Sequence, residues 1–184
     1  MEIKQQCMIV LEEVIGCIQN IDMSQIDLLI KEISRAKRIF CIGMGRSGFL
    51  IQAFCMRLNH LGFDAYLLGG VPCPPAKMGD LIIAASGSGE TLGIITVLQK
   101  AQQIGVKTVI ITASTGSSVS AYGDIIIRIQ APSTLIHNCK QSGQPMRTLF
   151  EQTVFIIYES IILWLKNYCN ITEEEMVQRH ANLE

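Results

Sequence analysis

Five short apolar segments, separated by longer amphipathic ones, constrain the fold of this chain more than any other feature. Apolar runs of this length are typical of strands that are buried on both faces of a parallel sheet. The segments are "RIFCIG" (38–43), "DAYLLG" (64–69), "DLIIAAS" (80–86), "KTVIITA" (107–113) and "GDIIIRI" (123–129). Because they alternate with helical patterns, the sequence predicts an α/β fold: a doubly wound, three-layer αβα sandwich around a five-stranded parallel sheet, with right-handed crossovers.

Apolar residues recur every three or four positions in the segments between and around these runs, which predicts helices. The predicted helices are residues 4–19, 24–36, 47–61, 91–103, 117–122 and 148–168, with a last short helix that ends near His180. Several helix ends carry the expected signals: Ser24 as an N-cap, Gly62 and Gly105 as stops, and Thr172 with Glu175 as a capping box.

The chain shows no internal repeat and no linker, so we expect one domain over residues 1–184. Two N-terminal helices (1–37) precede the sheet core (38–130). A polar loop (131–147) then leads to the C-terminal helices (148–184).

The helix near residues 149–165 is apolar nearly all round, and one sheet face cannot cover so much apolar surface. It is either a central core helix or part of a subunit interface, and the two N-terminal helices would also need covering. Its most apolar part, "TVFIIYESIILWL", contains Glu159 and is bounded by Glu151 and Lys166. We expect this segment to be too short and too charged to span a bilayer, so no membrane partner is predicted.

Composition excludes further classes of function. The formal net charge is −1 without a run of one sign, whereas a nucleic-acid partner requires clustered Lys and Arg. The seven cysteines are odd in number and scattered without a CxxC, which argues against a disulfide framework or a zinc site. We expect most of them to be small buried residues in a reducing, cytoplasmic environment. Acidic residues interrupt the apolar N-terminal stretch, so we expect no secretory signal there.

Two glycine-rich turns follow predicted strands and open predicted helices. The first, "GMGRSGF" (43–49), contains the G-x-G-x-x-G pattern of dinucleotide sites. Such sites also need an acidic residue at the end of the second strand, but Asp64 lies at its start, so NAD and FAD are disfavoured. No GKS or GKT follows either turn, which excludes a triphosphate-binding P-loop. A smaller anion therefore remains as the candidate ligand of the two turns.

Serine and threonine hydroxyls gather in both turns. Ligands of open α/β sheets bind beyond the carboxyl ends of the strands, and helix N-termini there offer free amides. The hydroxyls of Ser47, Ser86, Ser88 and Thr91 could therefore hold one phosphate monoester. The alternative is that these residues only cap helices.

Four further residues are considered as candidates for chemistry. Glu151, at the start of an apolar helix, is the best candidate for a general base, although it could instead complete a helix cap with Thr148. Arg46 could stabilise a negative charge that develops in a reaction or bind phosphate, or it could pair with an acid at a subunit contact. His60 is expected to cap or pack at a helix end, and His137 has a weak claim.

Together these motifs resemble the SIS (sugar isomerase) domain family, which contains phosphosugar binders and isomerases. The resemblance rests first on "GMGRSG" followed by "LIIAASGSGET". It extends over roughly 30–184, where "MRLNHLGFDAYLLGG", "QPMRTLFEQ" and "QRHANLE" are similar to the 6-phospho-3-hexuloisomerases of the ribulose monophosphate pathway. The SxSGxT turn is specific for the domain, and the last two motifs point to the isomerases.

This resemblance implies an SIS-type, flavodoxin-like fold and an isomerase that interconverts 3-hexulose 6-phosphate and fructose 6-phosphate. In this family the glutamate at Glu151 is the proposed base, and the histidine at His180 shuttles protons or opens the ring. The resemblance also implies a sugar phosphate as ligand, no cofactor and no metal, and a homotetramer built as a dimer of dimers.

One residue departs from the family pattern. A small residue, usually glycine, is expected between Met146 and Thr148, but this chain has Arg147. Arg147 could alter the rim of the site, add a phosphate contact or point to solvent. Two rival functions also stay open: a non-catalytic phosphosugar sensor, and an isomerase of another phosphosugar such as arabinose 5-phosphate.

Overall fold

Five parallel strands form one sheet in the computed structural model, which describes residues 2–132 and 142–183. The strand order is β2-β1-β3-β4-β5, and every neighbouring pair is parallel. The strands are β1 (Ile39–Gly43), β2 (Ala65–Leu67), β3 (Leu81–Ala85), β4 (Lys107–Thr112) and β5 (Ile125–Arg128). This order reverses direction between β1 and β3, as in doubly wound folds, and confirms the predicted fold class.

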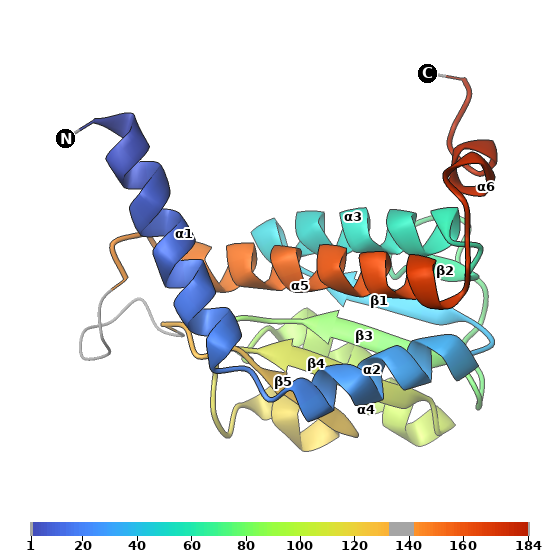
Figure 1. The fold of residues 1–184 in the computed structure, drawn as a ribbon. Helices are drawn as coiled ribbons and strands as arrows, with labels where there is room; N and C mark the ends of the chain where they lie inside the picture. Colours follow the sequence, from blue (N-terminus) through green and yellow to red (C-terminus); the bar gives the residue numbers. More distant parts are fainter. Residues whose placement is uncertain (1, 133–141, 184) are drawn as a thin grey trace.

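Helices cover both faces of the sheet, unequally (Figure 1). Helices α2, α3 and α5 lie on one face with α1 leaning against α5, whereas the other face carries α4 and the short 3₁₀ helix η1. The helices are α1 (Ile3–Gln19), α2 (Met23–Arg35), α3 (Gly45–His60), α4 (Leu92–Ile104), η1 (Ser118–Tyr122), α5 (Thr148–Tyr168) and α6 (Glu173–Gln178). All of them were predicted, and their bounds differ from the predicted ones by at most two residues.

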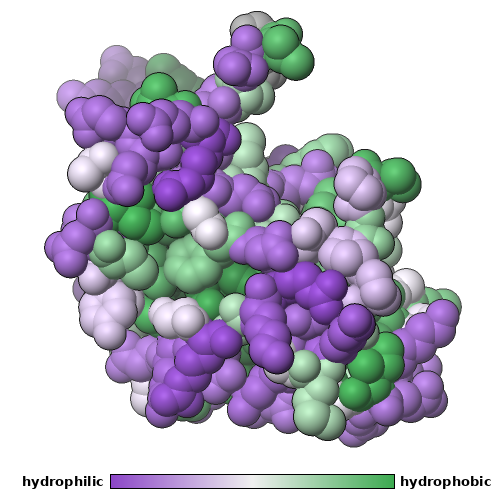
Figure 2. Space-filling view, turned by 90° about the vertical axis from the view of Figure 1, so that its right-hand side faces the viewer, coloured by the Kyte–Doolittle hydropathy of each residue, from purple (hydrophilic) through white to green (hydrophobic). Residues whose placement is uncertain are grey.

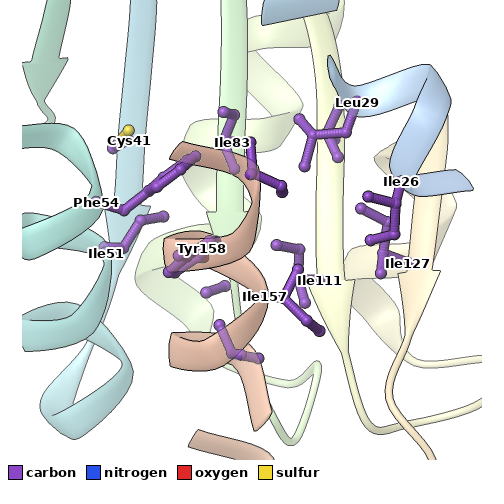
Figure 3. Packing of buried hydrophobic residues seen from close by; sticks show 14 of the residues in the cluster. Ile26, Leu29, Cys41, Ile51, Phe54, Ile83, Ile111, Ile127, Ile157 and Tyr158 are labelled. Atoms are coloured by element: carbon purple, nitrogen blue, oxygen red, sulfur yellow. The ribbon is translucent and has the colours of Figure 1, made fainter. Parts of the chain in front are cut away.

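Helices cover both faces of the sheet, and successive side chains of a strand point to opposite faces, so each strand contributes to two cores. In β1, Cys41 joins the larger core cluster beneath α2, α3 and α5, while Phe40 and Ile42 join the smaller cluster beneath α4. Figure 3 shows the larger cluster, in which α5 places Tyr158 against Phe54 of α3. The two rings stack with their centroids 4.3 Å apart.

Helix α5 is the central helix of that face. We expected its apolar segment to be too short and too charged to span a bilayer, and this expectation was wrong as far as length and composition go. Its 21 residues are long and apolar enough, by length and composition alone, to cross a membrane. However, half of its most apolar window is buried on the sheet, which is how the core helix of a folded domain packs. The remaining large apolar side chains, such as Leu163 and Trp164, are exposed along its outer side.

Two local predictions were also wrong. The N-cap of α2 is Asp22 rather than Ser24, because Asp22 Oδ1 accepts from the backbone N–H of Ser24 at 3.0 Å. Among the described cysteines only half are buried rather than most of them. Cys17, Cys41 and Cys55 are buried, and Cys7, Cys73 and Cys169 are exposed. Cys139 and His137 lie outside the described residues.

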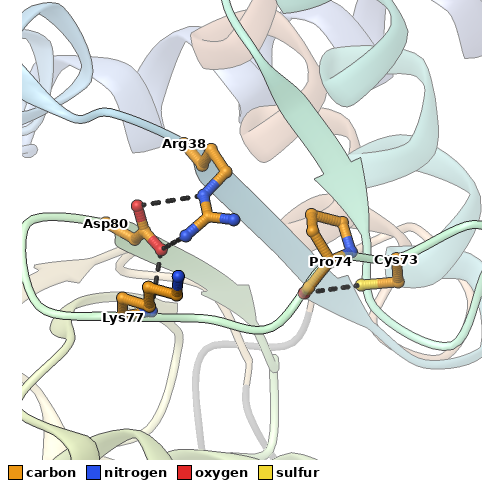
Figure 4. Close-up of polar contacts among 5 residues, drawn as sticks. All are labelled: Arg38, Cys73, Pro74, Lys77 and Asp80. Carbon is orange, nitrogen blue, oxygen red and sulfur yellow. Dashed lines mark hydrogen bonds and ion pairs between the residues drawn. The ribbon is translucent and has the colours of Figure 1, made fainter.

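The sheet has two chemically different ends. At the amino ends of the strands, Arg38 and Asp80 form a two-point ion pair with N–O distances of 2.8 and 3.3 Å, and Asp80 also accepts from the Lys77 amide (Figure 4). Hydrophobic residues gather in a hollow at this end, bounded by hydrophilic ones (Figure 2). The carboxyl ends of the strands point to the opposite side, where α3 and α5 begin (Figure 1).

Candidate functional site

The first glycine turn connects β1 to α3 in a very short path. A Cβ atom at Gly43 would lie 2.9 Å from the Ser47 carbonyl oxygen, and one at Gly48 would lie 2.9 Å from that of Gly43. Only glycine permits this close approach. The N-cap residue of α3, Met44, makes no side-chain cap, so no side-chain cap among the described residues occupies the first amides of the helix, where an anion could bind.

The second glycine turn lies beside the first, because Gly43 of β1 pairs in register with Ala85 of β3. The next residue, Ser86, is buried, and its Oγ accepts from the Gly89 amide at 3.1 Å and lies 3.1 Å from Thr91 Oγ1. Ser88 is only partly buried, and its Oγ accepts from the Glu90 amide at 3.3 Å. The predicted phosphate-binding hydroxyls of this turn therefore share one loop at the carboxyl edge of the sheet.

Thr91 is the N-cap residue of α4, yet its side chain makes no cap hydrogen bond in the described structure. The idea that these hydroxyls only cap helices therefore does not explain Thr91. Gly93, in the first turn of α4, lies close enough to the Met44 side chain that an added Cβ would meet it at 3.2 Å. The beginnings of α3 and α4 thus lie side by side, with Ser47 in the first and Thr91 in the second.

A third polar turn follows β4 at the same edge, and sequence reasoning missed it. The Glu90 carboxylate accepts from both the amide and the hydroxyl of Ser118, which fastens this turn to the second one. The two donors of Ser118 lower the pKa of Glu90. Gly89, at φ +69°, packs so closely on Ser117 that a Cβ atom would lie 2.1 Å from Ser117 Oγ. The stretch "TASTGSS" (112–118) has the same serine–glycine composition after a strand, and this signal could have revealed the turn.

Glu151 and Arg46 meet at this edge. Arg46 lies in the first turn of α3, and its Nε donates to Oε2 of Glu151 in the first turn of α5. The Glu151 side chain is 13% exposed and that of Arg46 is 66% exposed. The alternative cap with Thr148 is not formed, because Thr148 Oγ1 donates to the Pro145 carbonyl at 2.7 Å.

The start of α5 is held against the second turn. A Cβ atom on Gly87 would lie 3.0 Å from the ring of Phe150, the residue that precedes Glu151. On the other side, Glu13 of α1 accepts from Ser142, Gly143 and Gln144, which lead into α5. Burial raises the pKa of Glu13, but these three donors outweigh it, so the net shift is downward.

Several buried polar atoms near the start of α5 have no hydrogen-bond partner among the described residues. They are Gln144 Oε1, Arg147 Nε and Gln152 Oε1. Arg147 is the half-buried N-cap residue of α5 and follows Met146, whose φ is +58°. Buried donors and acceptors are normally paired, so the partners of these three atoms are expected outside the described residues.

His180 does not lie at this edge. Its ring packs on His60, with the centroids 5.2 Å apart, and His60 is the last residue of α3 whereas Arg46 is the second. A 16-residue helix is roughly 24 Å long, so one chain holds His180 and Glu151 at opposite ends of α3. His60 packs at the end of α3, as expected. Burial is the largest cause that lowers its pKa, followed by the charges of Arg57 and His180.

Next to the His60–His180 pair is a cavity of about 740 Å³. Its wall includes Tyr66, Arg179 and Cys55. In the described ranges, no three His, Cys, Asp or Glu side chains are placed to hold a metal ion. Asp64 stays at the start of β2, away from the carboxyl edge where a dinucleotide ribose would need it.

Comparison with known proteins identifies relatives of this arrangement. The sequence profile of the SIS domain matches residues 32–157. A protein of Bacillus subtilis named 3-hexulose-6-phosphate isomerase is 36% identical over 176 residues, 95% of each chain. A protein of the same name from Mycobacterium gastri is 31% identical over all of this chain and 92% of its own.

A solved structure agrees with these sequence relationships. The crystal structure of a hypothetical protein from Methanococcus jannaschii superimposes with a TM-score of 0.84 and 33% identity, covering 98% of this chain and 99% of that one. Its description infers a molecular function of 3-hexulose-6-phosphate isomerase for that protein.

Proposed function

Because the chain belongs to the SIS domain family, we propose that it is a phosphosugar isomerase that interconverts 3-hexulose 6-phosphate and fructose 6-phosphate. One observation carries the proposal: two serine-rich glycine turns end neighbouring strands at the edge where Arg46 meets Glu151. The full-length relatives named 3-hexulose-6-phosphate isomerase support this substrate over other phosphosugars.

The turns would bind the phosphoryl group. In this proposal the amides at the start of α3 and the hydroxyls of Ser47, Ser86, Ser88 and Thr91 are the neutral donors that would surround one anion. This contact lies away from the reacting carbons, and its binding energy can position the sugar chain.

Glu151 would act as the base. In the 3-keto sugar it removes the proton from C2, and the electron pair forms a 2,3-enediolate. The proton returns to C3 while a hydroxyl proton moves from O2 to O3, which leaves the carbonyl at C2. A positioned acid–base group contributes about 10²–10⁴-fold to such a step. Arg46 contacts Oε2 of Glu151, so Oε1 is the oxygen that faces the substrate in this proposal.

His180 can serve this site only from a second copy of the chain. Within one chain it lies at the far end of α3, beside His60. We therefore include in the proposal that His180 of a neighbouring copy moves the proton between O2 and O3.

The test is a coupled assay that supplies 3-hexulose 6-phosphate and follows fructose 6-phosphate. Turnover by the wild-type chain, lost in Glu151→Gln while fructose 6-phosphate still binds, supports the proposal. Glu159→Gln, two turns further along α5, is the matched control and keeps its activity. Tight binding without turnover by the wild type indicates a sensor, and turnover of arabinose 5-phosphate instead indicates another isomerase.

A mixing experiment tests the role of His180. Glu151→Gln and His180→Gln are each inactive, but after dissociation and reassembly together they form hybrid sites with both native residues. Partial recovery of activity supports a shared site. If the mixture stays inactive although hybrids form, His180 does not act across copies.

A further inference from the structure

We propose that Cys41 and Cys55 form a peroxide-reactive dithiol: Cys55 reduces a small hydroperoxide that reaches it through the cavity beside α3, and Cys41 then closes a disulfide with it. The inference concerns a covalent modification of the chain and does not depend on the proposed isomerase reaction. It starts from the position of two cysteines on neighbouring elements, Cys41 in β1 and Cys55 in α3.

The two cysteines face each other between β1 and α3. A Cβ atom on Gly43, at the end of β1, would lie 3.1 Å from Cγ2 of Ile51 in α3. Because β1 and β2 are parallel, the helix that connects them runs back along β1 in the opposite direction. Two residues back along the strand are about 6.6 Å and four residues forward along the helix are about 6 Å, so Cys41 lies opposite Cys55. Both belong to the larger core cluster, and Figure 3 shows Cys41 beside Phe54.

The two thiols differ in their access to small molecules. Cys41 is fully buried, whereas Cys55 is 6% exposed and lines the cavity of about 740 Å³ next to the His60–His180 pair. A water molecule takes up about 30 Å³ in the liquid, so this cavity has room for hydrogen peroxide, which is only slightly larger than water. Cys55 is therefore the sulfur that a small oxidant meets first.

The contact between the two thiols also places the negative charge on Cys55. The Cys41 thiol donates to the Cys55 sulfur, which lowers the pKa of Cys55 although burial opposes this shift. The same contact, together with burial and the charge of Cys55, raises the pKa of Cys41 well above its ordinary value. Because the thiolate is the nucleophilic form of cysteine, Cys55 attacks the peroxide and Cys41 is the resolving thiol.

The peroxide is reduced in two steps. In the first, the Cys55 thiolate attacks one peroxide oxygen, the O–O bond breaks and an S–O bond forms, which gives a sulfenic acid. The hydroxide that leaves takes up the proton that Cys55 lost on ionisation. In the second step, the Cys41 sulfur attacks the Cys55 sulfur, the S–S bond forms, and the hydroxyl group leaves as water with the Cys41 proton. Two thiols are oxidised to a disulfide, and hydrogen peroxide is reduced to water.

The disulfide keeps Cys55 in a reversible state of oxidation. An S–S bond of about 2.0 Å is shorter than a contact between two thiols, so α3 moves toward β1 when the bond closes. Without Cys41, the sulfenic acid persists and takes up a second peroxide oxygen. The product is a sulfinic acid, which thiol reductants do not restore. Cys41 therefore protects Cys55 from irreversible oxidation.

Cys17 is a matched control within the same chain. It is 5% exposed, close to the 6% of Cys55. Its Sγ donates to the Gln130 carbonyl at 3.3 Å, and burial raises its pKa. We therefore expect Cys17 to stay reduced under conditions in which Cys55 reacts.

The first test maps the oxidised cysteines of the full chain by mass spectrometry. Its background removes the thiols that could cross-link separate molecules: Cys7→Ser, Cys73→Ser, Cys139→Ser and Cys169→Ser. After hydrogen peroxide treatment of the folded protein, we expect peptides linked through Cys41 and Cys55, which dithiothreitol separates, and oxidation of Cys17 that is at least about tenfold slower. Circular dichroism verifies that the protein is folded during treatment. No link, a link that forms only in urea, or oxidation of Cys17 as fast as that of Cys55 overturns the proposal.

The second test separates the roles of the two cysteines in the same background. In Cys41→Ala, we expect a Cys55 sulfenic acid that dimedone traps and, after prolonged treatment, a sulfinic acid that dithiothreitol does not reduce. In Cys55→Ala, we expect Cys41 to be oxidised at least about tenfold more slowly than Cys55 in the parent protein. Rapid oxidation of Cys41 in Cys55→Ala, or full recovery of the Cys55 thiol in Cys41→Ala, overturns the proposed roles. The peptide map of the first test needs neither variant, so it decides the proposal even if one of them does not fold.

Discussion

Arg46 and Glu151 join the first turns of two helices, α3 and α5, although the residues are 105 positions apart in the sequence. The contact links the helix that follows the first glycine turn to the helix that carries the proposed base. Because the Glu151 side chain is mostly buried and that of Arg46 is mostly exposed, the arginine can hold the carboxylate and still reach a ligand.

The first prediction separates these two roles of Arg46 by a double-mutant cycle. Arg46→Met removes a charged hydrogen bond and is expected to lower kcat/KM by about 10–100-fold. If Arg46 acts through Glu151, the double variant with Glu151→Gln is no slower than Glu151→Gln alone. The measurement is kcat/KM for the four proteins. If the losses in kcat/KM of the two single variants multiply in the double variant, Arg46 makes its own contact with the phosphoryl group or the enediolate.

The second prediction concerns Gly89 in the serine-rich turn. Gly89→Ala forces a Cβ into the space of Ser117 Oγ and onto a left-handed backbone with φ +69°. We expect a loss of at least about 2 kcal/mol of unfolding free energy, or a displaced turn that no longer binds fructose 6-phosphate. Calorimetry of unfolding and of binding measures both.

Gly16→Ala in α1 is the matched control, because a Cβ there would meet no atom of the described residues within 4 Å. A helical glycine-to-alanine change in open space stabilises by up to about 1 kcal/mol. Normal stability and normal binding in Gly89→Ala would contradict the tight contact between the second and third turns.

The fold could be predicted because its signals are local. Each strand is buried on both faces and reads as an apolar run, and Gly62 and Gly105 adopt the left-handed conformation that ends a helix. The error at the start of α2 also has a local cause. Asp22 and Ser24 are both good N-caps, and only the geometry shows that the Asp22 carboxylate accepts from Ser24.

The site was predictable only in part, because its contacts are not local. Spacing alone suggested a cap between Thr148 and Glu151. In the structure the Thr148 hydroxyl donates to the Pro145 carbonyl, and the Glu151 carboxylate accepts from Arg46. The position of His180 is instead a consequence of helix length. A 21-residue helix carries the chain roughly 30 Å, so α5 starts at one edge of the sheet and delivers the C-terminal residues to the other.

The third prediction concerns the buried hydroxyl of Tyr158. This side chain is fully buried in the core, and its Oη has no partner among the described residues. Burial raises the pKa of Tyr158 well above its ordinary value, so the hydroxyl stays protonated. Tyr158→Phe keeps the stacking on Phe54 and is expected to leave stability unchanged or to raise it by about 1 kcal/mol. Urea unfolding measures this, and a clear loss would indicate a buried water bound to the hydroxyl.

The fourth prediction compares two ion pairs of different burial. Asp80 is fully buried and pairs with Arg38 at two points, whereas Glu32 lies 3.7 Å from a half-exposed Lys107. Asp80→Asn is expected to cost about 3 kcal/mol, because it leaves Arg38 without its carboxylate. Glu32→Gln is expected to cost less than about 1 kcal/mol. Equal effects in urea unfolding would contradict this difference.

The last prediction is a pH dependence of stability that His60 causes. Its pKa in the folded protein lies below the ordinary value of 6.5, first because of burial and then because of Arg57 and His180. Well above pH 6.5 the His60 ring is neutral in both the folded and the unfolded chain and does not change stability with pH. As the pH falls below 6.5, the unfolded chain takes up a proton that the folded chain does not, so stability decreases. Urea unfolding at fixed protein concentration, from pH 7.5 down to the onset of carboxylate titration, measures the slope.

His60→Gln should flatten this slope, because glutamine does not titrate. His180→Gln should keep most of it, since burial of His60 is the largest cause of the shift and the exposed His180 adds only the smallest part. If His180→Gln removes the slope and His60→Gln does not, His60 is not the group whose protonation destabilises the fold, and this prediction is wrong.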